Sequence, residues 1–232
     1  MKKILSTLFA LVILALVGQK LIAQSIEIPK TSHSYEAAIG FGDGVNGSIA
    51  WTRTHGLFQS KKIRLGYGLR LSAFGGSNLE YITAPANLTS NDETIDTLVV
   101  NSPLTMGLNA VIHIEYMLSS KLKLGFNIDA FGVGFGRESD AQFVSTESSQ
   151  FPGTISAKPT SYNLLLVGDN DIGHLKSEFF VAYRVTDPLW LKAGLDLTFS
   201  EYTTDRLLTH ENDRFRYKAM LFFVGVSFSP VK

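Results

Sequence analysis

His113 and Glu115 are the pair of residues in this 232-residue sequence whose spacing most directly suggests chemistry. Two residues apart in a β-strand, their side chains point to the same face. An imidazole and a carboxylate placed so could relay a proton or supply half of a metal site. No second histidine lies on the same face of another predicted strand. We therefore interpret the pair as an interior hydrogen bond and predict no metal site.

Two short motifs have the spacing of ligand-binding loops, but each lacks a required part. Gly42, Gly44 and Gly47 match a dinucleotide fingerprint, which needs a helix after it, whereas a predicted strand follows them here. Residues 169–171 offer three oxygen-bearing side chains, but Phe180 stands where an EF-hand requires a glutamate. We interpret the glycines as a hairpin corner and the acidic run as a turn, and we expect no cofactor.

Two further histidines, His174 and His210, lie in predicted loops among serines and acidic residues. Some membrane-embedded enzymes use Ser, His and Asp or Glu together, but no spacing joins these histidines to such partners. The absence of cysteine excludes disulfides, a thiolate nucleophile and cysteine-based zinc sites. We assign no catalytic residue and expect that the protein is not an enzyme, with a lipid-modifying enzyme left as an alternative.

The elements that must position these residues are predicted to be strands. Apolar and polar residues alternate with a period of two, and no window carries a helical stripe. After Ala130 the bulky residues move to the other phase, which predicts a β-bulge at that point. Eight strands are predicted, at 35–41, 45–53, 62–74, 104–118, 122–135, 179–185, 189–199 and 220–228.

The N-terminus predicts export from the cytoplasm. Two lysines precede an apolar run at 4–17, which is shorter than the roughly 20 residues that cross a bilayer as a helix, and Ala23 suits a signal peptidase. We predict a signal peptide at 1–23, a short segment at 24–33 and one β domain at 34–232. Removal of the signal leaves 18 basic and 21 acidic residues, so we expect no nucleic-acid partner.

The connections between the predicted strands alternate in length. Short turns follow the second, fourth and sixth strands, whereas long loops span 75–103 and 137–174. This is the layout of an outer-membrane barrel with both termini on its periplasmic side. Two sets of aromatic residues are expected near its rims: Tyr116, Tyr183 and Phe228 at the periplasmic rim, and Phe74, Phe135, Phe199 and Tyr202 at the outer one.

Volume decides which face of the strands points inward. A secreted ligand-holding barrel such as a lipocalin has the same alternation, but eight strands enclose little more than their own side chains. The apolar faces hold roughly 40 residues, too many for that interior, so they face lipid. Ten charged residues then lie inside, where they must pair or be solvated: Arg64, Arg70, Lys123, Arg184, Lys192, Glu36, Glu115, Asp129, Glu178 and Asp196. We interpret them as a plug of ion pairs, and a narrow channel stays open as an alternative.

On this layout the whole mature sequence resembles the small outer-membrane barrels of the OmpA and OmpX type. The resemblance implies an all-β fold, a transmembrane antiparallel up-and-down β-barrel of about eight strands with both termini periplasmic, in the cell outer membrane of a Gram-negative bacterium. Because it is a resemblance of layout, it carries over no functional residue.

The expected function is that of a non-catalytic outer-membrane barrel, surrounded by outer-membrane lipid, that acts structurally or through its loops. A protein partner is expected to contact the outer loops or the barrel wall, and one form of this hypothesis is an accessory subunit of a larger outer-membrane complex. The apolar run 164–167 in the second long loop has three interpretations: it extends the sixth strand, caps the barrel or docks on a partner.

Overall fold

The computed structural model describes residues 28–145 and 154–230 of the chain. The predicted signal peptide, residues 1–23, lies outside the described residues, as does the beginning of the segment 24–33. The described chain is all-β, and its helical elements are three short 3₁₀ turns, η1 (Asp92–Thr94), η2 (Gly168–Asn170) and η3 (Thr209–Glu211). Within the described ranges, no helix has both the length and the apolar character needed to cross a membrane.

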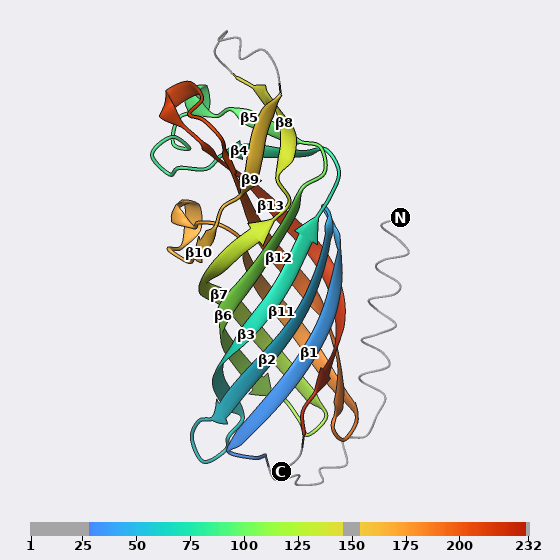
Figure 1. Ribbon diagram of the computed structural model, residues 1–232. Coiled ribbons are helices and arrows are strands. Elements are labelled where there is room, and N and C mark those ends of the chain that lie inside the picture. The colour runs from blue at the N-terminus through green and yellow to red at the C-terminus, as the bar shows by residue number, and fades with distance from the viewer. Residues whose placement is uncertain (1–27, 146–153, 231–232) are drawn as a thin grey trace, which may run out of the picture.

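Eight long antiparallel strands correspond to the eight predicted ones (Figure 1). They are β1 (Thr31–Gly42), β2 (Val45–Gly56), β3 (Ile63–Gly75), β6 (Leu104–Met117), β7 (Leu122–Gly136), β11 (Leu175–Thr186), β12 (Leu189–Thr204) and β13 (Arg214–Phe228). Each pairs with the next in this order, and β13 pairs back to β1, with Tyr35 opposite Phe228. We call this circuit of pairings the main ring.

Five short strands lie in the two segments that the sequence predicted as long loops. They are β4 (Leu79–Thr83), β5 (Thr97–Val100), β8 (Ser139–Val144), β9 (Ile155–Pro159) and β10 (Tyr162–Leu164). The sheet therefore has thirteen strands where the sequence predicted about eight. Alternation over three to six residues is too short to be distinguished from a loop, which is why these strands were missed.

Four of the short strands build a second circuit at one end of the main ring. The pairing order is β12, β9, β8, β5, β4, β13 and back to β12, so that the upper parts of β12 and β13 belong to both circuits. Figure 1 shows these strands above the long ones. We call this second circuit the far ring. It leaves no free edge among its strands, and an exposed edge is a site of unwanted strand pairing.

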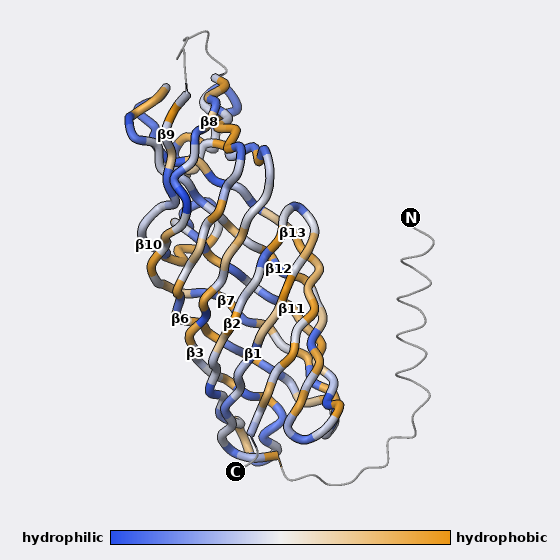
Figure 2. The backbone as a smooth tube through the Cα atoms, turned by 45° about the vertical axis from the view of Figure 1, so that its right-hand side comes forward, coloured by the Kyte–Doolittle hydropathy of each residue, from blue (hydrophilic) through white to orange (hydrophobic). Residues whose placement is uncertain are grey.

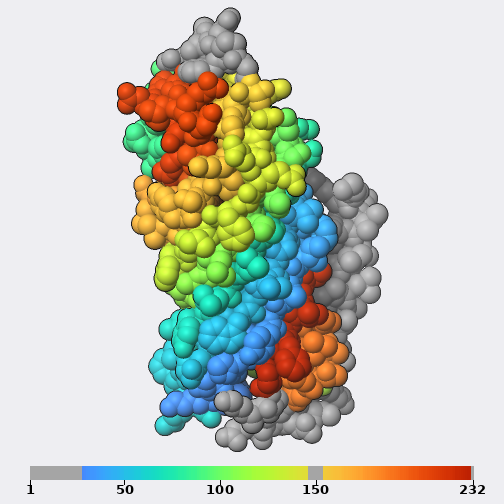
Figure 3. All heavy atoms as spheres, in the orientation of Figure 1, coloured from blue at the N-terminus to red at the C-terminus, as the bar shows by residue number. Residues whose placement is uncertain are grey.

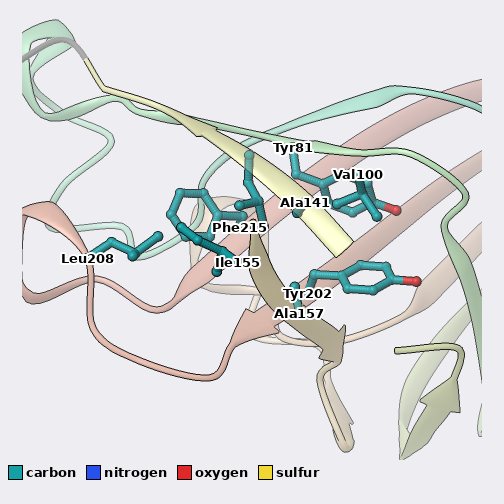
Figure 4. Packing of buried hydrophobic residues seen from close by; sticks show 9 residues of the cluster. Tyr81, Val100, Ala141, Ile155, Ala157, Tyr202, Leu208 and Phe215 are labelled. Carbon is teal, nitrogen blue, oxygen red and sulfur yellow. The ribbon is translucent and has the colours of Figure 1, made fainter. Parts of the chain in front are cut away.

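The far ring has an apolar core of its own (Figure 4). Tyr81 and Tyr202 meet edge to face with ring centroids 5.2 Å apart, and Phe215 packs in the same cluster. All three side chains are buried completely. The remaining members of the core are Leu98, Val100, Ala141, Ile155, Ala157 and Leu208.

Both ends of the described chain lie at the opposite end of the molecule, which we call the terminal end (Figure 1). The connections 57–62, 118–121 and 187–188 turn at this end, as predicted from their length. At the other end of the strands, Gly44 makes the corner between β1 and β2 with φ of +155°. A Cβ atom there would lie 2.6 Å from the Phe74 ring, so the corner needs glycine. This confirms that the glycine motif is a hairpin corner.

Burial confirms which face of the long strands points outward. Along β3, Arg64 and Arg70 are 2% exposed, whereas Leu69 on the other face is 52% exposed. Figure 2 shows hydrophobic residues recurring along the long strands. The predicted bulge is also present: Ala110 pairs with Phe131 and Val111 with Asp129, which leaves Ala130 without an opposite residue. The bulge returns the side chains after Ala130 to the outward apolar face.

The predicted outer set of aromatic residues was partly wrong. Phe135 is exposed as expected, but Phe74 and Tyr202 are completely buried. Alternation places Phe74 on the face of Arg70, and Tyr202 turns into the core of the far ring. Phe199 faces outward but is covered by the guanidinium of Arg216, whose Cζ lies 5.1 Å from the ring centroid. At the terminal end, Tyr116 and Phe228 are exposed on the wall.

Candidate functional site

The interior of the main ring holds a network of charged side chains. Of the ten predicted inward charges, nine have side chains that are less than a tenth exposed. The tenth, Arg184, is 18% exposed and pairs at the terminal end with Asp187, 2.8 Å away. The network divides into two groups at different heights in the ring.

The central cluster joins three basic and four acidic side chains: Arg70, Lys176 and Lys192 with Glu36, Asp129, Glu178 and Asp196. Glu178 lies at its middle, with Lys176 Nζ at 3.0 Å and Arg70 Nη1 at 3.4 Å from its Oε1. Asn127 donates a hydrogen bond of 2.8 Å to Oε2. Each carboxylate therefore meets a cation, as buried ions require.

Each cation of the central cluster contacts a second carboxylate. Arg70 donates from Nε and Nη2 to Asp129 Oδ1, at 2.9 and 2.6 Å. Lys192 pairs with Glu36, and Lys176 Nζ lies 3.0 Å from Asp196 Oδ2. These contacts connect β1, β3, β7, β11 and β12 across the interior.

Lys176 was missed by the sequence prediction, which began the sixth strand at 179. The structure begins β11 at Leu175 and buries Lys176. The alternation of Lys176, Glu178 and Phe180 on one face was the available signal. It was weak because Ser177, on the opposite face, interrupts the apolar row that an outward face would show.

The mouth cluster lies nearer the terminal end and is centred on Glu115. Its carboxylate oxygens lie 3.0 Å from Arg64 Nε, 2.8 Å from Lys123 Nζ and 3.3 Å from His113 Nε2. The contact of His113 with Glu115 confirms the predicted interior hydrogen bond. In the ranges that the structure describes, no three His, Cys, Asp or Glu side chains come together as they would around a metal ion.

A cavity of about 660 Å³ opens on the terminal side of the mouth cluster. Arg64, Glu115 and Lys123 line it, together with Trp190 and Met117. Lys123 Nζ and Arg184 Cζ lie 4.8 and 4.7 Å from the Trp190 ring centroid. None of the central-cluster residues lines this cavity, so the cavity is a vestibule on the terminal side of the central cluster.

The histidine His174 lies inside the ring, beside a serine that the sequence did not associate with it. Its Nε2 is 3.0 Å from Ser72 Oγ, and its Nδ1 faces Thr105 Oγ1 at 3.4 Å. A catalytic triad needs a carboxylate where Thr105 stands. Both Ser72 and His174 are also buried, at 1% and 2% exposure. His210 lies far along the chain in η3, and the structure does not bring it to this pair.

The acidic run 169–171 forms a turn, as predicted. Asp171 Oδ1 accepts hydrogen bonds of 2.8 Å from the backbone N–H groups of Leu166 and Val167. Asp169 instead reaches the outer face of β13, where its Oδ1 lies 3.2 Å from Arg216 Nη1 and 3.0 Å from Lys218 Nζ. Asp169 therefore holds the turn to the wall of the protein, and Asp171 fixes the backbone of the segment before it.

Comparison with known proteins gives structural likenesses at low identity. No family model matches the sequence, and no curated protein sequence matches it significantly. The Neisserial surface protein A shares 9% identity over 85% of this chain and 94% of its own, with a TM-score of 0.36. A major outer membrane protein from Thermus thermophilus shares 12% identity over 87% and 100%, with a TM-score of 0.41.

The outer membrane protein Ail of Yersinia pestis shares 7% identity over 86% of this chain and 97% of its own, with a TM-score of 0.36. The toluene transporter TodX of Pseudomonas putida is less similar, with a TM-score of 0.24. In all of these comparisons the TM-score is below 0.5, so these likenesses carry no inference about function. The structure assigns it an all-β fold with a polar, ion-paired interior and an apolar outer wall.

Proposed function

We propose that this protein is a non-catalytic β-barrel of the Gram-negative outer membrane, in which the eight strands of the main ring cross the bilayer. The apolar outward face carries this proposal. On β13 alone, Met220, Phe222 and Val224 are each more than half exposed. Water-soluble proteins rarely expose continuous apolar surface of this kind, whereas lipid requires it. The circuit of pairings supports the proposal because lipid cannot satisfy a free strand edge.

The orientation follows from the connections. Outer-membrane barrels carry short turns and both termini on the periplasmic side. The terminal end of this protein would then face the periplasm, and the far ring would face the cell exterior.

The packing of the interior supports a structural or binding role over transport. The central cluster fills the main ring with paired charges, and an apolar core fills the far ring. A narrow channel would need a continuous aqueous path through both. An enzyme would need an accessible nucleophile, whereas Ser72 is buried beside a histidine that lacks a carboxylate partner.

The far ring is the surface we propose for contact with a protein partner, as in an accessory subunit of an outer-membrane complex. It is rigid because its strands share a packed core, and rigid surfaces lose little entropy on binding. Exposed acids predominate on it and on its connections, including Glu80, Asp92, Glu93, Asp140 and Asp205. A partner with a basic contact surface fits this charge.

Fractionation of a Gram-negative host that produces the chain tests this proposal. The protein is expected in the outer-membrane fraction, with a gel mobility that changes when the sample is boiled, as folded membrane barrels show. Recovery of the mature chain as a soluble periplasmic species would contradict the proposal.

A further inference from the structure

The apolar run 164–167 opens an excursion in the wall of the main ring. Leu164 of β10 pairs with Phe131 of β7, in line with β11, which pairs with β7 further down. The chain then leaves the wall and returns at Leu175, where β11 begins. β10 thus extends the sixth long strand, as one interpretation of the sequence had it. Figure 3 shows the segment as a protrusion on the flank of the molecule, below the connection 205–213.

The tip of this excursion presents two apolar side chains to the surroundings. Leu166 is 49% exposed and Val167 is 75% exposed. Val167 has φ of +71°, a conformation that β-branched residues rarely adopt. Asp171 holds it there through the two hydrogen bonds to the backbone of Leu166 and Val167. The protein therefore maintains an unfavourable backbone conformation that projects a valine outward.

Register places the excursion at the upper limit of the apolar wall. Leu175 lies opposite Phe199, and Phe199 lies opposite Lys218. Below Lys218, the outward residues of β13 are apolar: Met220, Phe222, Val224, Val226 and Phe228. Lys218 and Arg216 therefore mark the boundary between the apolar wall and the polar far end, and they bind the excursion through Asp169.

The carboxylates of Asp169 and Asp171 both have partners, so neither leaves an uncompensated charge that would hinder contact of the excursion with lipid. Asp169 is paired with Lys218, whose hydrogen bond and charge lower the pKa of this carboxyl, and with Arg216. Asp171 is occupied by backbone N–H groups. Outside the excursion, Tyr162 and Phe131 continue the apolar surface on β10 and β7, at 51% and 61% exposure.

We infer that Leu166 and Val167 form an interfacial anchor that inserts into the outer leaflet of the membrane. The inference rests on the proposed membrane location of the main ring. A lipid surface fits better than a protein partner because the tip is level with the end of the apolar wall, where the wall itself meets headgroups. The anchor fixes the depth of the barrel in the bilayer on the β7–β11 side.

The absence of cysteine permits a direct test with single-cysteine variants. V167C and L166C would each be labelled with an environment-sensitive nitrobenzoxadiazole dye and folded into phosphatidylcholine vesicles, with and without doxyl-labelled lipid. L207C reports the far end, where Leu207 is 58% exposed, and L108C reports the wall, where Leu108 is 46% exposed.

We expect the labels at 166 and 167 to emit at shorter wavelength than the label at 207. Lipid with a doxyl group near the headgroup should quench the labels at 166 and 167 at least about twofold more strongly than the label at 207. The inference would be overturned if the labels at 166 and 167 showed the same emission and quenching as the label at 207. It would also be overturned if these two labels were shielded from water in native membranes but not in vesicles, which would indicate a protein partner. If the label at 108 also reports water, the proposed membrane crossing fails instead.

Discussion

Replacement of Lys176 by methionine tests whether the central cluster depends on charge balance. Lys176 is the cation that lies beside Asp196, and both side chains are completely buried. K176M keeps the length of the side chain but leaves Asp196 without a cation in the cluster, which then has two basic and four acidic groups. Breaking a buried ion pair by removal of one partner costs about 3–5 kcal/mol, because the remaining charge is uncompensated. We expect the free energy of unfolding to fall by about that amount.

The double variant K176M/D196N restores the original surplus of one acid in the central cluster. We expect it to recover at least about 2 kcal/mol relative to K176M, since the uncompensated charge is gone. K218M is the matched control: Lys218 is 60% exposed, and its loss should cost at most about 1 kcal/mol.

Urea unfolding in phosphatidylcholine vesicles, followed by the fluorescence of Trp51 and Trp190, measures these differences. A K176M protein within about 1 kcal/mol of the wild type, or a double variant no more stable than K176M, would show that the stability of the central cluster does not depend on its charge balance.

The wall, the far ring and the excursion each give a further prediction. L108R places a charge on the exposed wall of the main ring and should destabilise the folded state by about 2–4 kcal/mol in vesicles. L207R, at the far end, should change the free energy of unfolding very little, and equal effects of the two variants in urea unfolding would contradict the lipid-facing assignment. Y202A removes a buried ring from the far-ring core and should lower the local stability by about 3–5 kcal/mol. The far ring should then be cleaved faster by a protease, whereas V144A, at an exposed position, should leave the cleavage rate unchanged. Because Lys218 lowers the pKa of Asp169, the stabilisation from this contact is present above the ordinary pKa of 3.8 and is lost as pH falls below it. A label at 167 should therefore keep its emission from pH 8 to about pH 5 and change in acid, and D169N, which lacks this contact at every pH, should shift the emission at pH 8 toward the value that the wild type reaches in acid.

The sequence predicted the long strands well because each carries many alternating residues. Thirteen residues of β3 alternate without a break, so both its place and its inward face could be predicted, and with them the inward position of Arg64 and Arg70. The phase change at Ala130 was equally readable, since a bulge is the one local way to keep bulky residues outward.

The far ring could not be predicted in the same way. Its strands β4, β5, β8 and β9 have four to six residues each, and they are stabilised by contacts between segments far apart in the chain. Tyr202 belongs to this core, yet from sequence it looked like a residue at a membrane rim, because an aromatic residue fits both environments.

Within the interior, the ion pairs were predicted as a group, but their partners were not. Register across strands decides that Arg70 reaches Asp129 and that Lys123 reaches Glu115. The contact of Ser72 with His174 depends on a residue just before β11, in a segment that carried no strand signal.

Conductance of the purified, folded protein in planar lipid bilayers tests whether the main ring crosses the membrane with its interior sealed by the central cluster and the far ring. We predict that the protein inserts, as judged by its heat-modifiable gel mobility, and shows no steady ion-conducting openings. Steady openings of constant size in the inserted wild-type protein would contradict a sealed interior.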